Sequence, residues 1–581
     1  MCAGWGIPFH RTPLIVGVLL AFAYSSSLYA DEQTAEMRAL LKAQSDKLDE
    51  QAKVLADQAR LIREQSEFLE RQRQALKGII PASIQPQESA SGGSLPEVME
   101  TINLSAGTKP QEGEDASGTK KEKSKETPLK VFWGKDGRLM FKSEDRNFIA
   151  HIGGFFQLDA SFYSVSDSVQ QLLPDRGLLA GSDMRRARLR SDGVCWNVVE
   201  WVMEIDFSRA SDTTKDIISD PVPNVYINNM YIGLIDLPVF GNVRVGHIKE
   251  DLSFYNASSG RNIPFMERPN VWDAIEDPYI FDNGIMMSRT YLDDLLYVSL
   301  GLFMTNTRTG AFTVSPGAPL AFDVRVCYMP IYNEEDQHWM NIGATGSVRA
   351  NPYERGTELP VGQTTAAPLV RAGISSQVPN IINTRPFYTR EGTQLYTLCY
   401  NHSWGPFSMG AQYDGQFFNQ SYVGGLPRSD GSLPDKVKPV GDLYFDGGAI
   451  EFLCFLTRGD HRTINKNFPC YGQVIPAENF SFARSGSSGE SAHGLGAWEV
   501  GVKYDLVRAQ LEVPGAPVVQ RGGYLNAITL GLNWYLNPNA SVMANYIYTT
   551  GFFGTQKADG ANQAPADGAF HSFGTRFQFT F

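Results

Sequence analysis

The sequence predicts an all-β fold, a transmembrane antiparallel β-barrel, preceded by an N-terminal α-helical coiled coil. Two observations predict the barrel. Between Tyr524 and Phe581 apolar and polar residues alternate, which is the pattern of strands with one apolar face. The 581 residues also contain no apolar run of the ~20 residues that a membrane helix needs. Lipid cannot satisfy a free sheet edge, so strands that face lipid must close into a barrel. A soluble antiparallel sandwich is the alternative.

The C-terminal segment supplies the clearest strands. Apolar residues from Ile528 to Leu536 alternate with polar ones, a turn follows at 537–539, and the chain then doubles back as a hairpin. The last strand places alternate aromatic residues on one face, and its terminal aromatic resembles the C-terminal signature of bacterial outer-membrane barrels. We therefore assign barrel closure and assembly to Phe577, Phe579 and Phe581.

The N-terminal region predicts an exported protein. The apolar residues 14–23 follow His10 and Arg11 and precede a small-residue site at 28–30, which is typical of a signal peptide over residues 1–30. Residues 81–132 are rich in Ser, Gly, Pro, Lys and Glu and predict a flexible linker.

Residues 36–77 between these segments predict a coiled coil. Apolar residues recur there at intervals of seven, namely Leu41, Leu48, Leu55, Ile62, Leu69 and Leu76. The second seam position is polar or small in either frame, so the helices alone should associate weakly. A trimeric barrel would hold them together, whereas a lone solvated helix is the alternative.

Residues 133–581 are predicted to form the barrel, with the first strand near Asn147. In 184–190 arginines alternate with apolar residues, and the arginines must face the lumen because they cannot face lipid. The next strand directs acidic residues inward, and these are Glu200, Glu204 and Asp206.

Similar alternation recurs at 296–304, 322–328, 340–348, 407–417, 449–456 and 498–504. At about 25 residues per strand with its connection, the region allows about 16 to 18 strands, and we predict sixteen. An even count places both ends of the barrel on one side, where short turns are expected. That side is the periplasmic one, so the coiled coil is predicted to lie in the periplasm.

Several segments together resemble the family of phosphate-selective porins O and P. They are 183–190 (DMRRARLR), 242–249 (NVRVGHIK), 265–268 (FMER), 455–457 (FLT), 496–499 (GAWE) and 531–538 (GLNWYLNP). The resemblance covers about residues 133–581 but not the coiled coil or the linker. It implies a sixteen-stranded barrel, normally a trimer, in which one inward-folded loop narrows each pore and basic residues line the anion path.

Carried over to this sequence, the inward loop is about 250–274 and contains Phe265, Met266 and Glu267. The candidate pore-lining residues are Arg186, Arg188, Arg190, Arg244, Arg261, Arg268 and Arg325. Arginine suits this role because its planar fork binds an oxyanion through two hydrogen bonds and stays charged.

Two alternative roles stay open. From residue 145 onward there are about 32 basic and about 43 acidic residues, and the arginines precede an acidic strand. The two rows could therefore form a cross-strand ion-pair network that stiffens the wall. Residues 265–268 could likewise be a structural latch of the loop.

The sequence also departs from the family at one motif. The family's Leu-Thr-Gly-Glu pattern is replaced here by Leu456-Thr457-Arg458-Gly459-Asp460.

These observations predict an outer-membrane porin that passes small hydrophilic solutes, with a bias toward anions or phosphate. The alternative is a structural envelope protein that binds peptidoglycan or a partner through its coiled coil. Neither a catalytic grouping nor a glycine-rich phosphate loop is present, so we predict no enzyme activity, cofactor or metal. The net charge of -12 argues against a nucleic-acid partner. Whether any of Cys195, Cys327, Cys399, Cys454 and Cys470 pair is left open.

Overall fold

The computed structural model describes residue 42 and residues 127–581, except for the gaps 135–137, 172–179, 209–224, 305–319, 351–368, 371–380, 385–386, 426–430, 482–493, 515–519 and 555–565. The predicted signal peptide, and nearly all of the predicted coiled coil and linker, lie outside the described residues. Strand β1 (Leu129–Trp133) begins before residue 133, so the last residues assigned to the linker belong to a strand.

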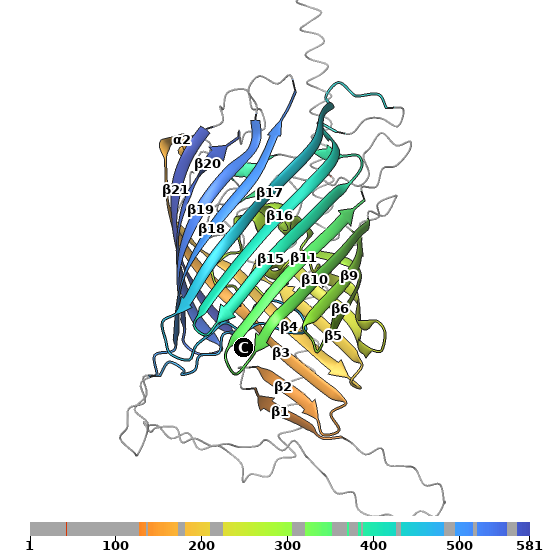
Figure 1. Ribbon diagram of the computed structural model, residues 1–581, viewed down its shortest axis with the longest axis vertical. Coiled ribbons are helices and arrows are strands. Elements are labelled where there is room, and N and C mark those ends of the chain that lie inside the picture. Colours follow the sequence, from red (N-terminus) through yellow and green to blue (C-terminus); the bar gives the residue numbers. More distant parts are fainter. Residues whose placement is uncertain are drawn as a thin grey trace, which may run out of the picture. The chain divides into compact units, whose positions relative to one another are not determined.

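The described residues contain a closed barrel of sixteen antiparallel strands, as the sequence predicts (Figure 1). The strands are β3 (Phe148–Val165), β4 (Gly181–Cys195), β5 (Val199–Asp206), β6 (Tyr226–Leu237), β7 (Gly241–Lys249), β8 (Phe281–Tyr291), β9 (Leu296–Met304), β10 (Leu320–Asn333), β11 (His338–Arg349), β15 (Thr393–Trp404), β16 (Phe407–Val423), β17 (Lys438–Phe455), β18 (Ala497–Glu512), β19 (Gln520–Tyr535), β20 (Ala540–Phe553) and β21 (Ala566–Thr580). Each pairs with the next.

Strand β21 returns to β3 and closes the ring, with Phe573 opposite Phe162. The terminal Phe581 continues this ladder, because its N–H donates to the carbonyl of Gly154 (3.0 Å) and its own carbonyl accepts from the N–H of Gly154 (2.9 Å). Closure leaves no free edge in the barrel wall, which is the requirement for strands that face lipid.

Short strands accompany the barrel. Strands β1 and β2 (Leu139–Ser143) form a hairpin, and β2 pairs with the first residues of β3. The prediction of a first strand near Asn147 therefore missed this hairpin. Strands β12 (Leu369–Val370) and β13 (Ile382–Asn383) form a separate pair, and β14 (Tyr388–Thr389) pairs with β16.

The two faces of the wall follow the predicted alternation. On β3, Phe156 and Leu158 are 40% and 48% exposed on the outside, whereas Gln157 and Asp159 are buried on the lumenal side. The final strand repeats the pattern, since Phe577 is exposed and Arg576 is buried. The outer face is therefore apolar and the inner face polar, as in a barrel that lipid surrounds.

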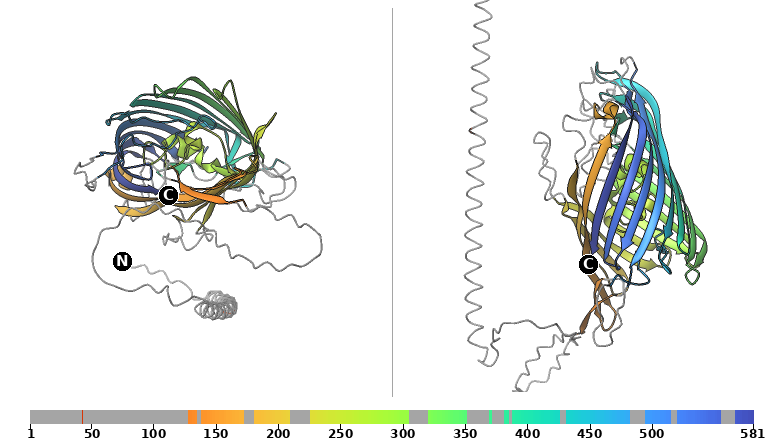
Figure 2. Two further views of the ribbon diagram at one scale, coloured as in Figure 1. Left: turned by 90° about the horizontal axis from the view of Figure 1, so that it is seen from below. Right: turned by 90° about the vertical axis from the view of Figure 1, so that its left-hand side faces the viewer.

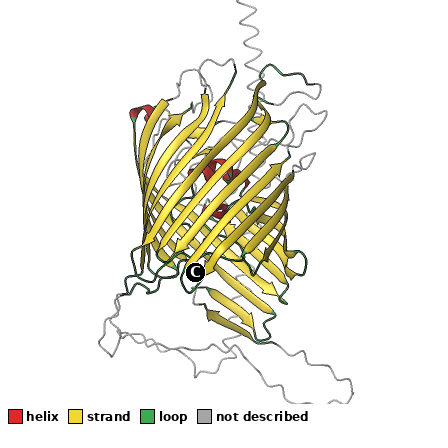
Figure 3. Ribbon diagram, in the orientation of Figure 1, coloured by secondary structure: helices red, strands yellow, loops and turns green. Residues whose placement is uncertain are grey.

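The lumen holds short helices that Figures 2 and 3 show inside the ring of strands. They are α3 (Phe254–Ala257), α4 (Asn270–Ile275) and the 3-10 helix η2 (Asp277–Tyr279), whereas α2 (Asp167–Gln170) follows β3. Helix α4 packs against β16, β17 and β18. No helix among the described residues is both long and apolar enough to span a membrane.

The connections differ between the two ends of the barrel. At the end that holds Phe581, most are tight turns, such as 196–198, 238–240, 405–406 and 536–539. The prediction of short turns at this end fails at one place, because residues 456–496 between β17 and β18 form a long connection. Its described part, 456–481, enters the barrel and contributes to the site described next.

Candidate pore constriction

The connection 250–280 between β7 and β8 folds into the lumen and includes α3, α4 and η2. It is nearly all buried, and polar side chains from distant strands hold its backbone. Gln157 Nε2 donates to the Gly260 carbonyl (3.0 Å), and Asn533 Nδ2 donates to the Pro264 carbonyl (2.7 Å). These bonds satisfy carbonyls of an irregular backbone that would otherwise be stranded inside the barrel.

Residues 265–268 fasten this loop to the wall. Phe265 is 2% exposed, and its ring lies over Gly501 and Gly531, where a Cβ would come within 3.0 Å and 2.9 Å of the ring. The Met266 N–H donates to Asn545 Oδ1 (2.7 Å). These contacts are those of a latch, which was one of the two roles left open for this segment.

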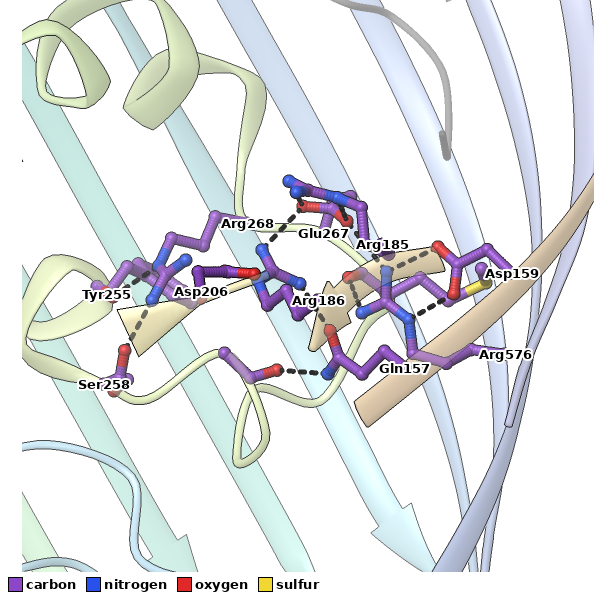
Figure 4. Close-up of polar contacts among 12 residues, drawn as sticks. Gln157, Asp159, Arg185, Arg186, Asp206, Tyr255, Ser258, Glu267, Arg268 and Arg576 are labelled. Carbon is purple, nitrogen blue, oxygen red and sulfur yellow. Dashed lines mark hydrogen bonds and ion pairs between the residues drawn. The ribbon is translucent and has the colours of Figure 1, made fainter. Parts of the chain in front are cut away.

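Glu267 lies among three arginines (Figure 4). Its carboxylate accepts from Arg185 (2.7 and 3.0 Å), Arg186 (3.3 Å) and Arg576 (2.8 Å). Burial alone would raise the pKa of Glu267, but the three guanidinium groups hold that pKa well below its usual range. Arg576 is paired with Asp159 as well, through two bonds of 2.7 Å.

The arginine row of β4 faces the acidic row of β5. Arg188 donates to Asp206 (2.8 Å) and Glu204 (3.1 Å), and Arg190 donates to Asp192 (2.7 Å). One further pair, Arg244 Nε to Glu200 Oε1 at 2.6 Å, joins β7 to β5. The cross-strand ion pairs that the sequence allowed are therefore present.

These pairs remain partly open to the lumen. The side chains of Arg188, Arg190 and Arg244 are 18%, 30% and 18% exposed. Arg190 donates a hydrogen bond to Asp192 and lies 3.5 Å from a Glu204 carboxylate oxygen, whereas its guanidinium carries five N–H groups. This wall therefore offers guanidinium hydrogen-bond donors to a solute in the lumen.

Two loop arginines have different environments. Arg268 donates to the carbonyls of Tyr255 (2.8 Å) and Ser258 (2.5 Å) (Figure 4). Its guanidinium also lies over the Trp272 ring, so it organises the loop. Burial lowers its pKa to about 10. Arg261 Nε is buried without a hydrogen-bond partner among the described residues, and burial together with Arg190 lowers the pKa of Arg261.

Arg325 lies apart from the other predicted pore-lining residues. Its side chain is 1% exposed, forms an ion pair with Asp251 and donates to the Pro469 carbonyl (2.6 Å). The structure thus brings Arg186, Arg188 and Arg190 together on one wall and places Arg325 under the loops.

Residues 456–481 form a second segment in the lumen, which the sequence reasoning missed. Arg462 is 0% exposed, pairs with Glu499 and donates to the Asn262 carbonyl (2.8 Å). The Tyr471 N–H donates to Ser258 Oγ (3.0 Å). The two inserted segments therefore touch each other. The 41 residues between Phe455 and Ala497 were the available signal, because an ordinary turn needs far fewer.

A small pocket lies where these parts meet. The inward loop, the second segment and the turn at 536–539 all contribute to it, and its lining includes Arg261, Asn262, Gln473, Tyr535, Asn537 and Gln578. Arg261 is the only charged residue of this lining.

Comparison with known proteins agrees with this geometry. The sequence profile of the phosphate-selective porin O and P family matches residues 156–357 and 468–581, which is more than half of the chain. The chain belongs to this family. Its closed barrel and family membership identify it as an outer-membrane channel protein. No curated protein sequence matches the chain.

Several solved porin structures are similar to the chain at low sequence identity. An anion-selective porin from Comamonas acidovorans is 12% identical, with 74% of this chain and 100% of that chain covered and a TM-score of 0.40. The outer membrane channel DcaP of Acinetobacter baumannii is 12% identical over 76% and 99% of the chains, with a TM-score of 0.39. A loop-deletion mutant of OmpT of Vibrio cholerae is 11% identical over 75% and 100%, with a TM-score of 0.39.

Proposed function

We propose that this porin passes small hydrophilic solutes by passive diffusion, with a bias toward anions such as phosphate. The observation that carries the proposal is the set of partly exposed guanidinium groups on β4 and β7, of which Arg190 is 30% exposed. Arginine binds oxyanions through paired hydrogen bonds at any relevant pH.

The neighbouring acids shape how these groups would act. Each exposed arginine already has a carboxylate partner, so an anion would meet a partly compensated charge. Such a site binds weakly, and a channel needs weak sites so that ions both enter and leave. The ion pairs and the anion path are therefore compatible functions of the same residues.

The test is the reversal potential of the purified full-length protein in a planar bilayer under a potassium chloride gradient, followed by addition of phosphate. Anion selectivity with block of the chloride current by phosphate supports the proposal. Cation selectivity without block would contradict it and would leave the arginines as ion pairs of the wall.

We also propose that the protein assembles as a homotrimer. Strands β5, β7 and β9 have 8, 9 and 9 residues, whereas β16 and β17 have 17 and 18. A strand needs about 9–11 residues to cross the bilayer, so this wall only just reaches the required height, which supports contact with another subunit there. Native mass spectrometry of the detergent-solubilised protein distinguishes three chains from one.

The role of the N-terminal region stays a prediction. The proposed coiled coil at 36–77 would add weak association in the periplasm and could contact peptidoglycan. Deleting residues 36–77 and measuring sedimentation of the protein with purified peptidoglycan tests that contact separately from channel activity.

A further inference from the structure

Two histidines meet on the outer wall of the barrel near its periplasmic end. His338 begins β11, and His402 lies near the end of the neighbouring strand β15; Figure 1 shows these two strands side by side. Their Nε2 atoms are 2.9 Å apart, and their rings stack with centroids separated by 5.1 Å. The channel function uses neither residue.

The alternation along each strand places both rings outside the lumen. Trp339 on β11 and Ser403 on β15, the next residues in the chain, are buried on the lumenal side. His338 and His402 are half-buried on the opposite face, beside Trp404, which is 67% exposed. The tight turn 334–337 directly precedes His338 and the turn 405–406 directly follows Trp404, so the pair lies at this rim of the wall.

The distance between the two nitrogens fits a shared metal ion. At a metal–nitrogen length of about 2.05 Å, two ligands at 90° place their nitrogens about 2.9 Å apart, whereas a tetrahedral angle requires about 3.3 Å. The observed 2.9 Å is a hydrogen-bond distance in the metal-free pair, and it is close to the separation that cis ligands of a square-planar or octahedral ion require. Imidazole nitrogen suits Cu²⁺ and Ni²⁺, which prefer such geometries.

A neighbouring side chain can orient the ligand. The Tyr400 hydroxyl lies 3.1 Å from His402 Nδ1. In the metal-free pair one Nε2 must carry the proton that the other accepts. If His402 Nε2 carries that proton, metal binding moves the proton to Nδ1 of the same ring, where Tyr400 Oη accepts the hydrogen bond. The lone pair of Nε2 is then available to bind the ion. Such outer partners fix the tautomer of metal-binding histidines.

The local charge favours a cation. The turn before His338 carries three acidic residues in a row, Glu334, Glu335 and Asp336, all exposed. Within the described residues no group of three or more His, Cys, Asp or Glu side chains is arranged to hold a metal ion. The histidine pair would therefore supply two ligands, and water would complete the coordination.

We propose that His338 and His402 form a binding site for a divalent transition-metal ion of the Cu²⁺ or Ni²⁺ type at the periplasmic rim of the barrel. Tyr400 is a positioning residue for this site. The site is independent of the pore, because it lies on the opposite face of the wall from the constriction.

The test is titration of the untagged full-length protein with Cu²⁺ by isothermal calorimetry and electron paramagnetic resonance. Wild type is expected to bind one ion per chain with two nitrogen ligands. The variants H338Q and H402Q should each bind at least tenfold more weakly, and Y400F about tenfold more weakly. The matched control is H571Q, because the exposed His571 on β21 also has a tyrosine hydroxyl beside its Nδ1 (Tyr546 Oη, 2.7 Å); it should bind as wild type.

Channel conductance and the gel mobility of the unheated barrel establish that each variant is folded. Equal Cu²⁺ affinity of wild type and the double variant H338Q/H402Q, or a spectrum with a single nitrogen ligand, would overturn the proposal. A result in which only H571Q loses binding would overturn it too, because the ion would then belong to β21.

Discussion

Replacing Arg462 with methionine is expected to release residues 456–481 from the lumen and to raise the single-channel conductance. Both Arg462 and Glu499 have side chains that are 0% exposed, and the guanidinium also donates to Tyr535 Oη (2.6 Å) and to the Asn262 carbonyl. Removing one partner of a buried ion pair leaves the other charge uncompensated, which costs about 3–5 kcal/mol. Each 1.4 kcal/mol is tenfold in an equilibrium, so the detached population should grow by at least about a hundredfold.

The assay is single-channel recording in planar bilayers, combined with urea unfolding of the purified barrel followed by gel mobility. The matched control is R458M, because Arg458 lies in the same segment but is exposed. R458M should behave as wild type, and R462M/E499Q should recover part of the lost stability because no charge is left uncompensated. A folded R462M with wild-type conductance and stability would refute the role of this segment in the constriction.

Two further predictions concern the inward loop. Burial raises the pKa of Glu276 to about 7, so the folded barrel holds this proton more tightly than the unfolded chain. This stabilisation is complete below about pH 4.5 and is lost as pH rises through 7. The urea midpoint of the wild-type protein should therefore fall between pH 5 and 8, and that of E276Q should fall less. Equal falls of the urea midpoint in the two proteins would contradict this. Replacing Phe265 with alanine should cost about 3–5 kcal/mol and increase open-channel current noise, and a quiet, equally stable F265A channel would show that the ring does not latch the loop.

The barrel itself could be predicted from the sequence because its signal is local. The alternation of apolar and polar residues along a single strand indicates which residues face lipid, and this prediction needs no information on distant contacts. The alternation therefore places Glu204 and Asp206 on the same lumenal face as the arginines of β4, and both acids form ion pairs with Arg188.

The two inserted segments could not be placed in the same way. Irregular backbone inside a barrel is held by single side chains far away in the sequence, such as Asn533 to the Pro264 carbonyl and Arg462 to the Asn262 carbonyl. No periodic pattern marks such contacts. The family resemblance supplied the first inward loop, but the second segment had only its unusual length as a signal.

The separation of pore-lining from structural arginines was likewise beyond the sequence. Arg190 and Arg325 both occupy lumenal positions on their strands, yet their side chains are 30% and 1% exposed. This difference in exposure depends on which part of the barrel wall the inserted loops cover. The loops pack over β10 and β15–β20 and leave part of β4 and β7 open.

The measurement that tests the central claim most directly is the reversal potential of R190Q compared with that of R508Q. Arg508 is a matched control because it also forms an ion pair, with Asp446, but is 58% exposed on the outer face of β18. If the open arginines of β4 line the permeation path, R190Q should shift the reversal potential toward cation selectivity while R508Q leaves it unchanged. An unchanged potential in R190Q, or equal shifts in both variants, would contradict the account.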